Sequence, residues 1–175
     1  MFILPPLETT LICFVTLAAI SDLAWRRISN VLILSGLCCA LALHLLHAPA
    51  AVPAVWLGGA LSGFFAFLPL YLLRGMAAGD VKLMAMAGAF LGPCPALQAA
   101  AASVLIGGAM GLAIVIYRGR LRQALGNVAF LLTPLLWRAA GAPLKRVTLA
   151  PGASVGGMPY GLAIALGCLW LVLKR

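Results

Sequence analysis

The stretch Ala77-Ala78-Gly79-Asp80-Val81-Lys82-Leu83 places a carboxylate and an ammonium at the start of an apolar run. The chain of 175 residues has only three acidic residues, and the other two are Glu8 and Asp22. Glu8 lies near the N-terminus, where a charge is readily solvated. Asp22 and Asp80 each border a long apolar run, where an ionised group is costly to keep. We therefore expect these two aspartates to have a shared function.

The composition around this stretch is that of a membrane protein. The chain is 65% hydrophobic and only 9% charged, with a mean hydropathy of +1.15, and a soluble domain would need far more polar surface. Only helices and closed barrels satisfy the backbone within lipid. The apolar runs are continuous rather than alternating, which indicates helices. The predicted fold class is therefore all-α, a polytopic transmembrane helix bundle forming one integral membrane domain over residues 1–175.

Six apolar runs are candidates for membrane spans, judged against the ~20 residues that a crossing needs. They cover residues 7–23, 31–46, 55–73, 81–92, 96–117 and 160–173. The fourth run is short, so we expect it to tilt or to begin inside a cavity. Residues 118–159 are predicted to form a cytoplasmic loop with an interfacial segment at 128–137. Glycines spaced four apart, at 59/63, 88/92 and 107/111, predict close helix packing inside the bundle.

Basic residues predict the orientation of this bundle. In a soluble protein, the net charge of +9 would favour nucleic acid as the partner. Here the basic residues lie between apolar runs. We therefore expect them to contact anionic lipid headgroups and to set the topology. With the N-terminus outside, only Lys174 and Arg175 of the basic residues lie outside. Asp22 then ends the first span and Asp80 precedes the fourth. Both aspartates are therefore expected at the cytoplasmic end of the bundle.

Two carboxylates in one shielded site do not titrate alike, and the pair can share one proton near neutrality. One then acts as base on a water molecule while the other polarises a carbonyl, which is the chemistry of aspartic peptidases and needs no metal or other cofactor. The alternatives are local: Asp22 pairs with Arg26 four residues on, or Asp80 caps a helix. At the level of function, the alternatives are a proton-coupled transporter and a non-catalytic assembly subunit.

Three segments resemble motifs of one enzyme family, the prepilin leader peptidases, which are GxGD-type membrane aspartic proteases. Residues 21–30, Ser-Asp-Leu-Ala-Trp-Arg-Arg-Ile-Ser-Asn, resemble the first motif, and residues 77–83 resemble the GxGD motif. Residues 158–161, Met-Pro-Tyr-Gly, resemble a third motif that enters the last span. The sequence departs from the pattern at Ala77, where the family has glycine, and at Ser29, where it has proline. Ser29 is expected to cap the second helix.

The resemblance implies a function and a set of site residues. Asp22 and Asp80 would be the catalytic pair of an endopeptidase that cuts leaders from prepilins or pseudopilins at the cytoplasmic face of the bacterial inner membrane. The chain contains no CxxC pair, so it is similar to the short form that serves Flp-type, tight-adherence pili and does not methylate the new N-terminus. Residues expected to contact substrate or to support the aspartates are Asn30, Gly79, Lys82, Pro159 and Tyr160.

Two further interpretations concern single side chains. Lys82 either stabilises the charged form of Asp80 or extends to the lipid headgroups, and the sequence leaves both open. His44 and His47, three residues apart near the outer end of the second span, are expected at the membrane interface rather than in a metal site.

Overall fold

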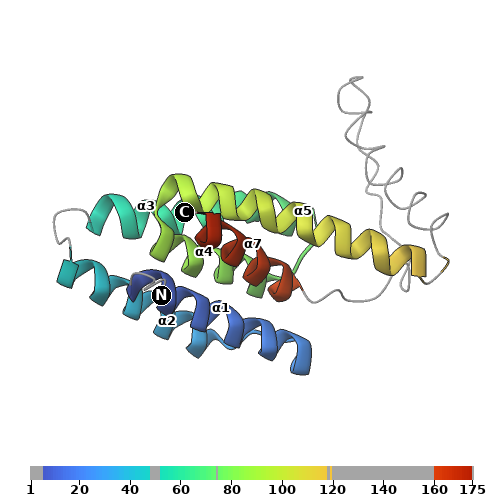
Figure 1. The fold of residues 1–175 in the computed structure, drawn as a ribbon, viewed down its shortest axis with the longest axis horizontal. Helices are drawn as coiled ribbons and strands as arrows, with labels where there is room; N and C mark the ends of the chain where they lie inside the picture. The colour runs from blue at the N-terminus through green and yellow to red at the C-terminus, as the bar shows by residue number, and fades with distance from the viewer. Residues whose placement is uncertain (1–5, 48–51, 74, 118, 120–159, 175) are drawn as a thin grey trace, which may run out of the picture. The chain divides into compact units, whose positions relative to one another are not determined.

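A computed structural model describes residues 6–47, 52–73, 75–117, 119 and 160–174. Every regular element in the described residues is a helix (Figure 1). In chain order these are α1 (Pro6–Trp25), α2 (Asn30–His47), the π-helical segment η2 (Pro53–Leu57), α3 (Gly58–Leu72), α4 (Ala78–Leu91), α5 (Pro93–Tyr117) and α7 (Tyr160–Lys174). The predicted all-α fold class is confirmed.

Four helical segments are long and apolar enough to cross a membrane: Pro6–Trp25, Asn30–His47, Ala54–Leu72 and Pro93–Tyr117. The protein is therefore a polytopic helical membrane protein. The prediction that the fourth run is short is confirmed, since α4 has 14 residues, a length of about 21 Å against the ~30 Å of a hydrocarbon core. α7 is also short, with 15 residues. α5 begins at Pro93, earlier than predicted, because proline is well tolerated at the first position of a helix.

The chain divides into two compact units. The first comprises Met1–Gly108 with Pro159–Arg175, and the second comprises Ala109–Met158. In the second unit the structure describes the C-terminal part of α5 and Gly119. The interfacial segment predicted at residues 128–137 lies outside the described residues. The single domain over residues 1–175 stays a prediction.

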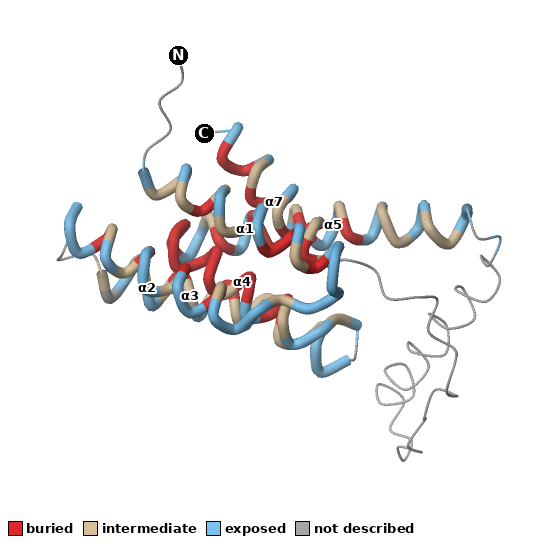
Figure 2. Tube along the Cα trace, turned by 90° about the horizontal axis from the view of Figure 1, so that it is seen from below, coloured by how far each residue is buried: buried red, intermediate tan, exposed pale blue. Residues whose placement is uncertain are grey.

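Within the first unit, α4 is the core helix. It is buried along nearly its whole length, whereas the helices around it each expose one side (Figure 2). It contacts α1, α2, α3 and α7, most extensively α3. Its residues are apolar or small from Leu83 onward, so this part can be covered on all sides. The first turn of α4, which carries Asp80, is therefore fixed by the surrounding helices.

Glycines allow α3 and α4 to approach backbone to backbone. A Cβ atom added to Gly59 would collide with the carbonyl of Gly88, and one added to Gly63 would collide with the carbonyl of Met84. These contacts confirm the prediction that Gly59, Gly63 and Gly88 serve packing inside the bundle. Gly92 ends α4 with a positive φ of 85°, which suits glycine.

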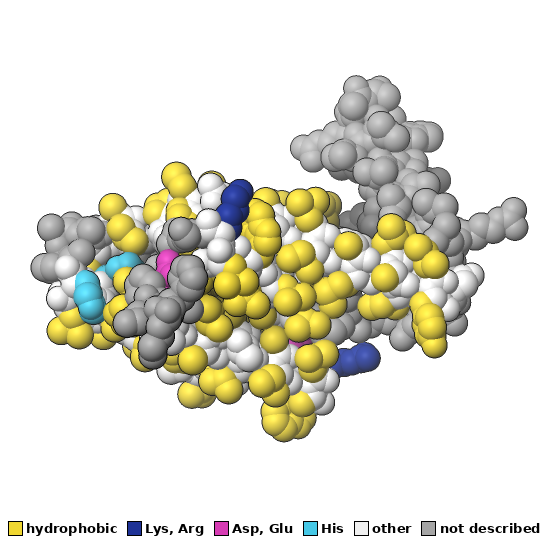
Figure 3. Space-filling view, in the orientation of Figure 1, with side chains coloured by type: hydrophobic (Ala, Val, Ile, Leu, Met, Phe, Trp, Pro, Cys, Tyr) yellow, Lys and Arg dark blue, Asp and Glu magenta, His cyan; other side chains and the backbone are white. Residues whose placement is uncertain are grey.

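Many large apolar side chains are exposed on the described helices, as expected of helices that face lipid. The face in Figure 3 is mostly hydrophobic with isolated charged side chains. His44 is buried, with 6% of its surface exposed, and its Nε2 lies 3.0 Å from the carbonyl oxygen of Ala89. This hydrogen bond satisfies the ring inside the α2–α4 contact, and the location of His44 at the membrane interface stays a prediction. His47 is exposed.

Candidate active site

Asp22 lies in the last turn of α1 and is buried. Its Oδ2 accepts a hydrogen bond of 2.8 Å from the backbone N–H of Gly161, in the first turn of α7. The C-terminal end of a helix disfavours an anion, whereas the N-terminal end favours one. The first turn of α7 therefore offsets the unfavourable position that Asp22 has in its own helix.

The alternative in which Asp22 pairs with Arg26 does not hold. Among the described residues, Asp22 forms no ion pair with Arg26, whose side chain is exposed. Arg26 has a φ of 51°, and its N–H donates to the Asp22 carbonyl at 2.9 Å. This left-handed residue ends α1, so Arg26 no longer follows the helical spacing that would bring its side chain over Asp22.

Asp80 lies in the first turn of α4 and is 5% exposed. Its Oδ2 accepts the N–H of Ala77 at 3.1 Å, and its own N–H donates to the Ala77 carbonyl at 3.1 Å. Asp80 thus caps this helix, as the local alternative expected, and the contact fixes the carboxylate against the helix start. Ala77 has an extended backbone (φ −82°, ψ 155°), so this turn does not need the freedom of glycine.

The two aspartates interact electrostatically, although they come from α1 and α4. Asp80 precedes the predicted fourth span and lies outside the four long apolar helices. Burial raises the pKa of Asp80 to about 6; the Ala77 N–H opposes this rise, and the charge of Asp22 adds to it. The charge of Asp80 also interacts electrostatically with Tyr160. The structure thus brings together side chains from α1, α4 and α7 that lie far apart in the sequence.

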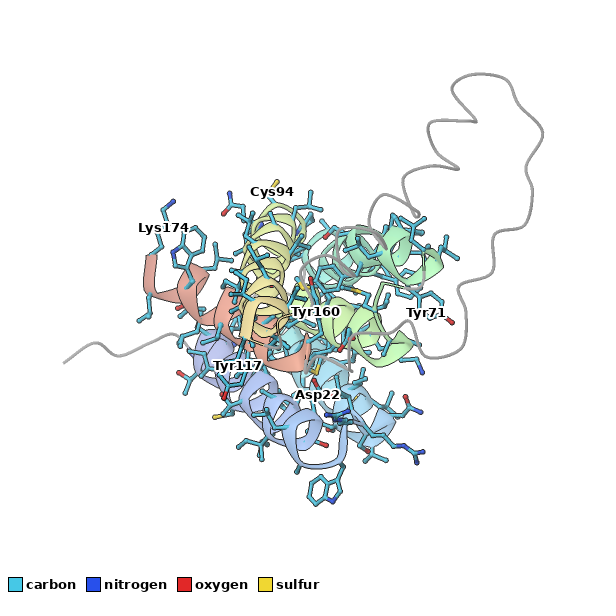
Figure 4. All side chains as sticks on the ribbon, turned by 90° about the vertical axis from the view of Figure 1, so that its right-hand side faces the viewer. Asp22, Tyr71, Cys94, Tyr117, Tyr160 and Lys174 are labelled. Carbon is cyan, nitrogen blue, oxygen red and sulfur yellow. The ribbon has the colours of Figure 1, made fainter. Side chains whose placement is uncertain are left out.

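Tyr160 begins α7 and packs between two other helices. Its ring meets Phe67 of α3 edge-on, with centroids 6.1 Å apart. The same ring occupies the space beside Gly107 of α5, where a Cβ atom would lie 2.7 Å from it. In Figure 4, Asp22 and Tyr160 lie within the packed helices, whereas Lys174 lies at their edge. The hydroxyl of Tyr160 makes no hydrogen bond to another described residue.

Lys82 reaches Asn30 rather than Asp80. Its Nζ donates to Oδ1 of Asn30 at 3.0 Å, which joins α4 to the start of α2. Because successive positions on a helix face different directions, Asp80 points into the core while Lys82 points toward α2. This contact differs from both roles expected from the sequence, which were to stabilise the charged form of Asp80 or to extend to the lipid headgroups. The prediction that Ser29 caps α2 is confirmed, since its Oγ accepts the N–H of Val31 at 3.2 Å.

An apolar groove opens beside this hydrogen bond. It has a volume of about 360 Å³ and is lined by α2, α3 and α4, with Asn30 and Lys82 among the lining residues. Gly79 lies nearby against Ile28, and a Cβ atom there would meet Ile28 at 3.6 Å, an ordinary contact. Pro159, the remaining predicted site residue, lies outside the described residues.

A profile of the type IV leader peptidase family matches residues 9–112. The chain belongs to this family. The match includes both aspartates, along with Asn30, Gly79 and Lys82, and so agrees with the resemblance carried by the first two motifs. No curated protein and no solved structure matches the chain.

One residue of this site was not predicted from the sequence. Gly161 donates the hydrogen bond to Asp22, yet it lies beyond the matched residues. Its only signal in the sequence was its place in the Met-Pro-Tyr-Gly segment at the start of the last span. A backbone donor carries no side chain to mark it, so the contact became visible only with the packing of α7 against α1.

Proposed function

We propose that this member of the type IV leader peptidase family is an aspartic endopeptidase that removes the leaders of prepilins or pseudopilins. The observation that carries the proposal is the interaction of two buried aspartates, Asp22 and Asp80, each held by a backbone N–H. Such a pair shares a proton, so one member acts as base on water while the other donates to the scissile carbonyl. This chemistry proceeds without a metal or other cofactor.

The charge pattern supports a site at the cytoplasmic face of the bacterial inner membrane, with the N-terminus outside. Asp22 lies near the end of α1 and Asp80 near the start of α4, with two helical crossings between them, which is consistent with both lying at one end of the bundle. A substrate with a basic leader and an apolar helix would lie in the bilayer beside the bundle, with its scissile bond at the interface. Anionic lipid would attract the basic leader, since this face of the enzyme is itself basic.

We further propose that the enzyme cleaves without methylating the new N-terminus, like the Flp-type form that it resembles. The sequence contains no CxxC pair of the kind found in the bifunctional form. Mass spectrometry of the processed pilin is expected to show an unmodified N-terminus. A methyl group whose addition depends on this protein alone would contradict the proposal.

Co-expression with a pilin precursor tests the function in cells. Wild type is expected to shorten the precursor, while Asp22→Asn and Asp80→Asn leave it intact at equal membrane abundance. Glu8→Gln, which removes the third acidic residue of the chain, is the matched control and is expected to process normally. Cleavage by both aspartate variants would favour the non-catalytic assembly subunit or the proton-coupled transporter instead.

A further inference from the structure

Asp22 occupies a position that does not by itself favour a charge. It lies in the last turn of α1, where the backbone carbonyls present the negative end of the helix dipole. It is also buried, with 9% of its surface exposed. An ionised carboxylate at this position needs a donor from another part of the chain.

The first turn of α7 supplies that donor. The first four N–H groups of a helix have no acceptor within the helix, and they lie at the positive end of its dipole. Gly161 is the second residue of α7, and its N–H donates to Asp22 Oδ2 at 2.8 Å. Within the described residues, this is the one hydrogen bond of the Asp22 side chain, so the position of the carboxylate depends on it.

Only glycine permits this approach. A Cβ atom at position 161 would lie 2.9 Å from Oδ2 and 3.0 Å from Cβ of Asp22. Side-chain carbons do not approach other atoms so closely, so any larger residue would push the carboxylate away from the N–H. The site therefore needs both the backbone donor and the missing side chain of Gly161.

We propose, resting on the proposed peptidase function, that Gly161 is a positioning residue: the start of α7 holds the Asp22 carboxylate in place beside Asp80. Asp22 is then the base that activates water, and Asp80 is the acid. Asp80 receives its hydrogen bond from its own helix start, at the longer distance of 3.1 Å, and is the more deeply buried of the two. The raised pKa of Asp80 agrees with this division of roles.

The resulting reaction balances in protons and bonds. Asp22 takes a proton from water as the water oxygen bonds to the carbonyl carbon, and Asp80 gives its proton to the carbonyl oxygen. Asp22 then passes its proton to the amide nitrogen while Asp80 takes one back from a hydroxyl of the tetrahedral intermediate. The C–N bond breaks, which releases a carboxylic acid and an amine and restores both aspartates to their starting states.

Kinetics of the full-length protein in nanodiscs, with a synthetic prepilin as substrate, test the role of Gly161. Gly161→Ala is expected to lower kcat by about 100-fold or more and to leave KM within about threefold, because it misplaces a reacting group without removing substrate contacts. Gly108→Ala in α5 is the control, since a Cβ atom there would meet nothing within 4 Å. It is expected to keep kcat within about threefold of wild type.

Hydrogen exchange gives a second measurement that leaves the glycine unchanged. Because Gly161 has no acceptor within its own helix, protection of its amide reports the bond to Asp22. Exchange at Gly161 is expected to be slow in wild type and at least about tenfold faster in Asp22→Ala, while the Gly167 amide stays unchanged. Equal protection of Gly161 in the two proteins would overturn the proposal even where Gly161→Ala fails to fold.

The outcomes separate this inference from the proposed function. Equal effects of Gly161→Ala and Gly108→Ala, with Asp22→Asn inactive, would overturn the role of Gly161 and leave the peptidase in place. Unchanged cleavage in Asp22→Asn would instead refute the peptidase chemistry itself.

Discussion

At the scale of single residues, the two aspartates differ in what surrounds them. Asp22 is bonded to the start of a distant helix, and Asp80 is bonded to the start of its own. The sequence indicated that both acids had a function, because they were the only two beside apolar runs. It did not indicate their partners, because backbone donors have no signature in a sequence. Lys82 shows the same limit: its bond to Asn30 depends on how α2 and α4 pack.

The pH dependence of cleavage is a first prediction at this scale. With the pKa of Asp80 at about 6, the protonated acid is half populated at pH 6 and only about one tenth populated at pH 7. If Asp80 must donate a proton, kcat/KM rises about fivefold as the pH falls from 7 to 6 and drops about tenfold per unit above pH 7. A rate that increases from pH 6 to pH 8 in the purified enzyme would contradict this assignment.

The hydrogen bond between Lys82 and Asn30 yields a second prediction. Lys82→Met and Asn30→Ala each remove the same contact, so each is expected to lower the melting temperature by a few degrees, ~2–4 °C. The double variant is expected to lose no more than the larger single loss, because the two residues share one bond. Melting of all four proteins in one detergent checks this, and fully additive losses would show that the side chains act independently.

At the scale of elements, the sequence predicted the location of the helices better than it predicted the residues at which they end. Continuous apolar runs located the six α-helices of the described residues, and glycine spacing identified the close contact of α3 with α4. The end of α1 was harder to foresee, because Arg26 ends it in a left-handed conformation that propensity does not favour. The burial of His44 was also missed, because a polar ring becomes compatible with a core only when a specific carbonyl, here that of Ala89, accepts its bond.

The contact between α3 and α4 gives a prediction of stability. Gly59→Ala is expected to destabilise the fold by about 1–3 kcal/mol, because the new methyl group meets the Gly88 carbonyl. Gly108→Ala is the control, since a Cβ atom there meets nothing within 4 Å; it is expected to be neutral or to stabilise by up to ~1 kcal/mol. Reversible unfolding in mixed micelles measures both. Equal effects of the two substitutions would mean that the backbone contact contributes little.

At the scale of the whole molecule, a nearly fully buried helix brings the parts of the site together. α4 carries Asp80 at its start and contacts both α1, which carries Asp22, and α7, which carries Tyr160 and Gly161. The sequence predicted that Asp22 and Asp80 lie at the same end of the bundle, because an even number of crossings separates them, and it left open whether they touch. The resemblance placed Pro159 and Tyr160 in the site, but the sequence could not predict that the N–H of Gly161 bonds to Asp22.

The central claim is that Asp22 and Asp80 together activate a water molecule to split a peptide bond. The most direct test is single-turnover cleavage of a synthetic prepilin by purified wild type, Asp22→Asn, Asp80→Asn and Glu8→Gln in nanodiscs. Each aspartate variant is expected to cleave about 10²- to 10⁴-fold more slowly than wild type, and Glu8→Gln is expected to stay close to wild type. Cleavage at the wild-type rate by either correctly inserted aspartate variant would contradict the central claim.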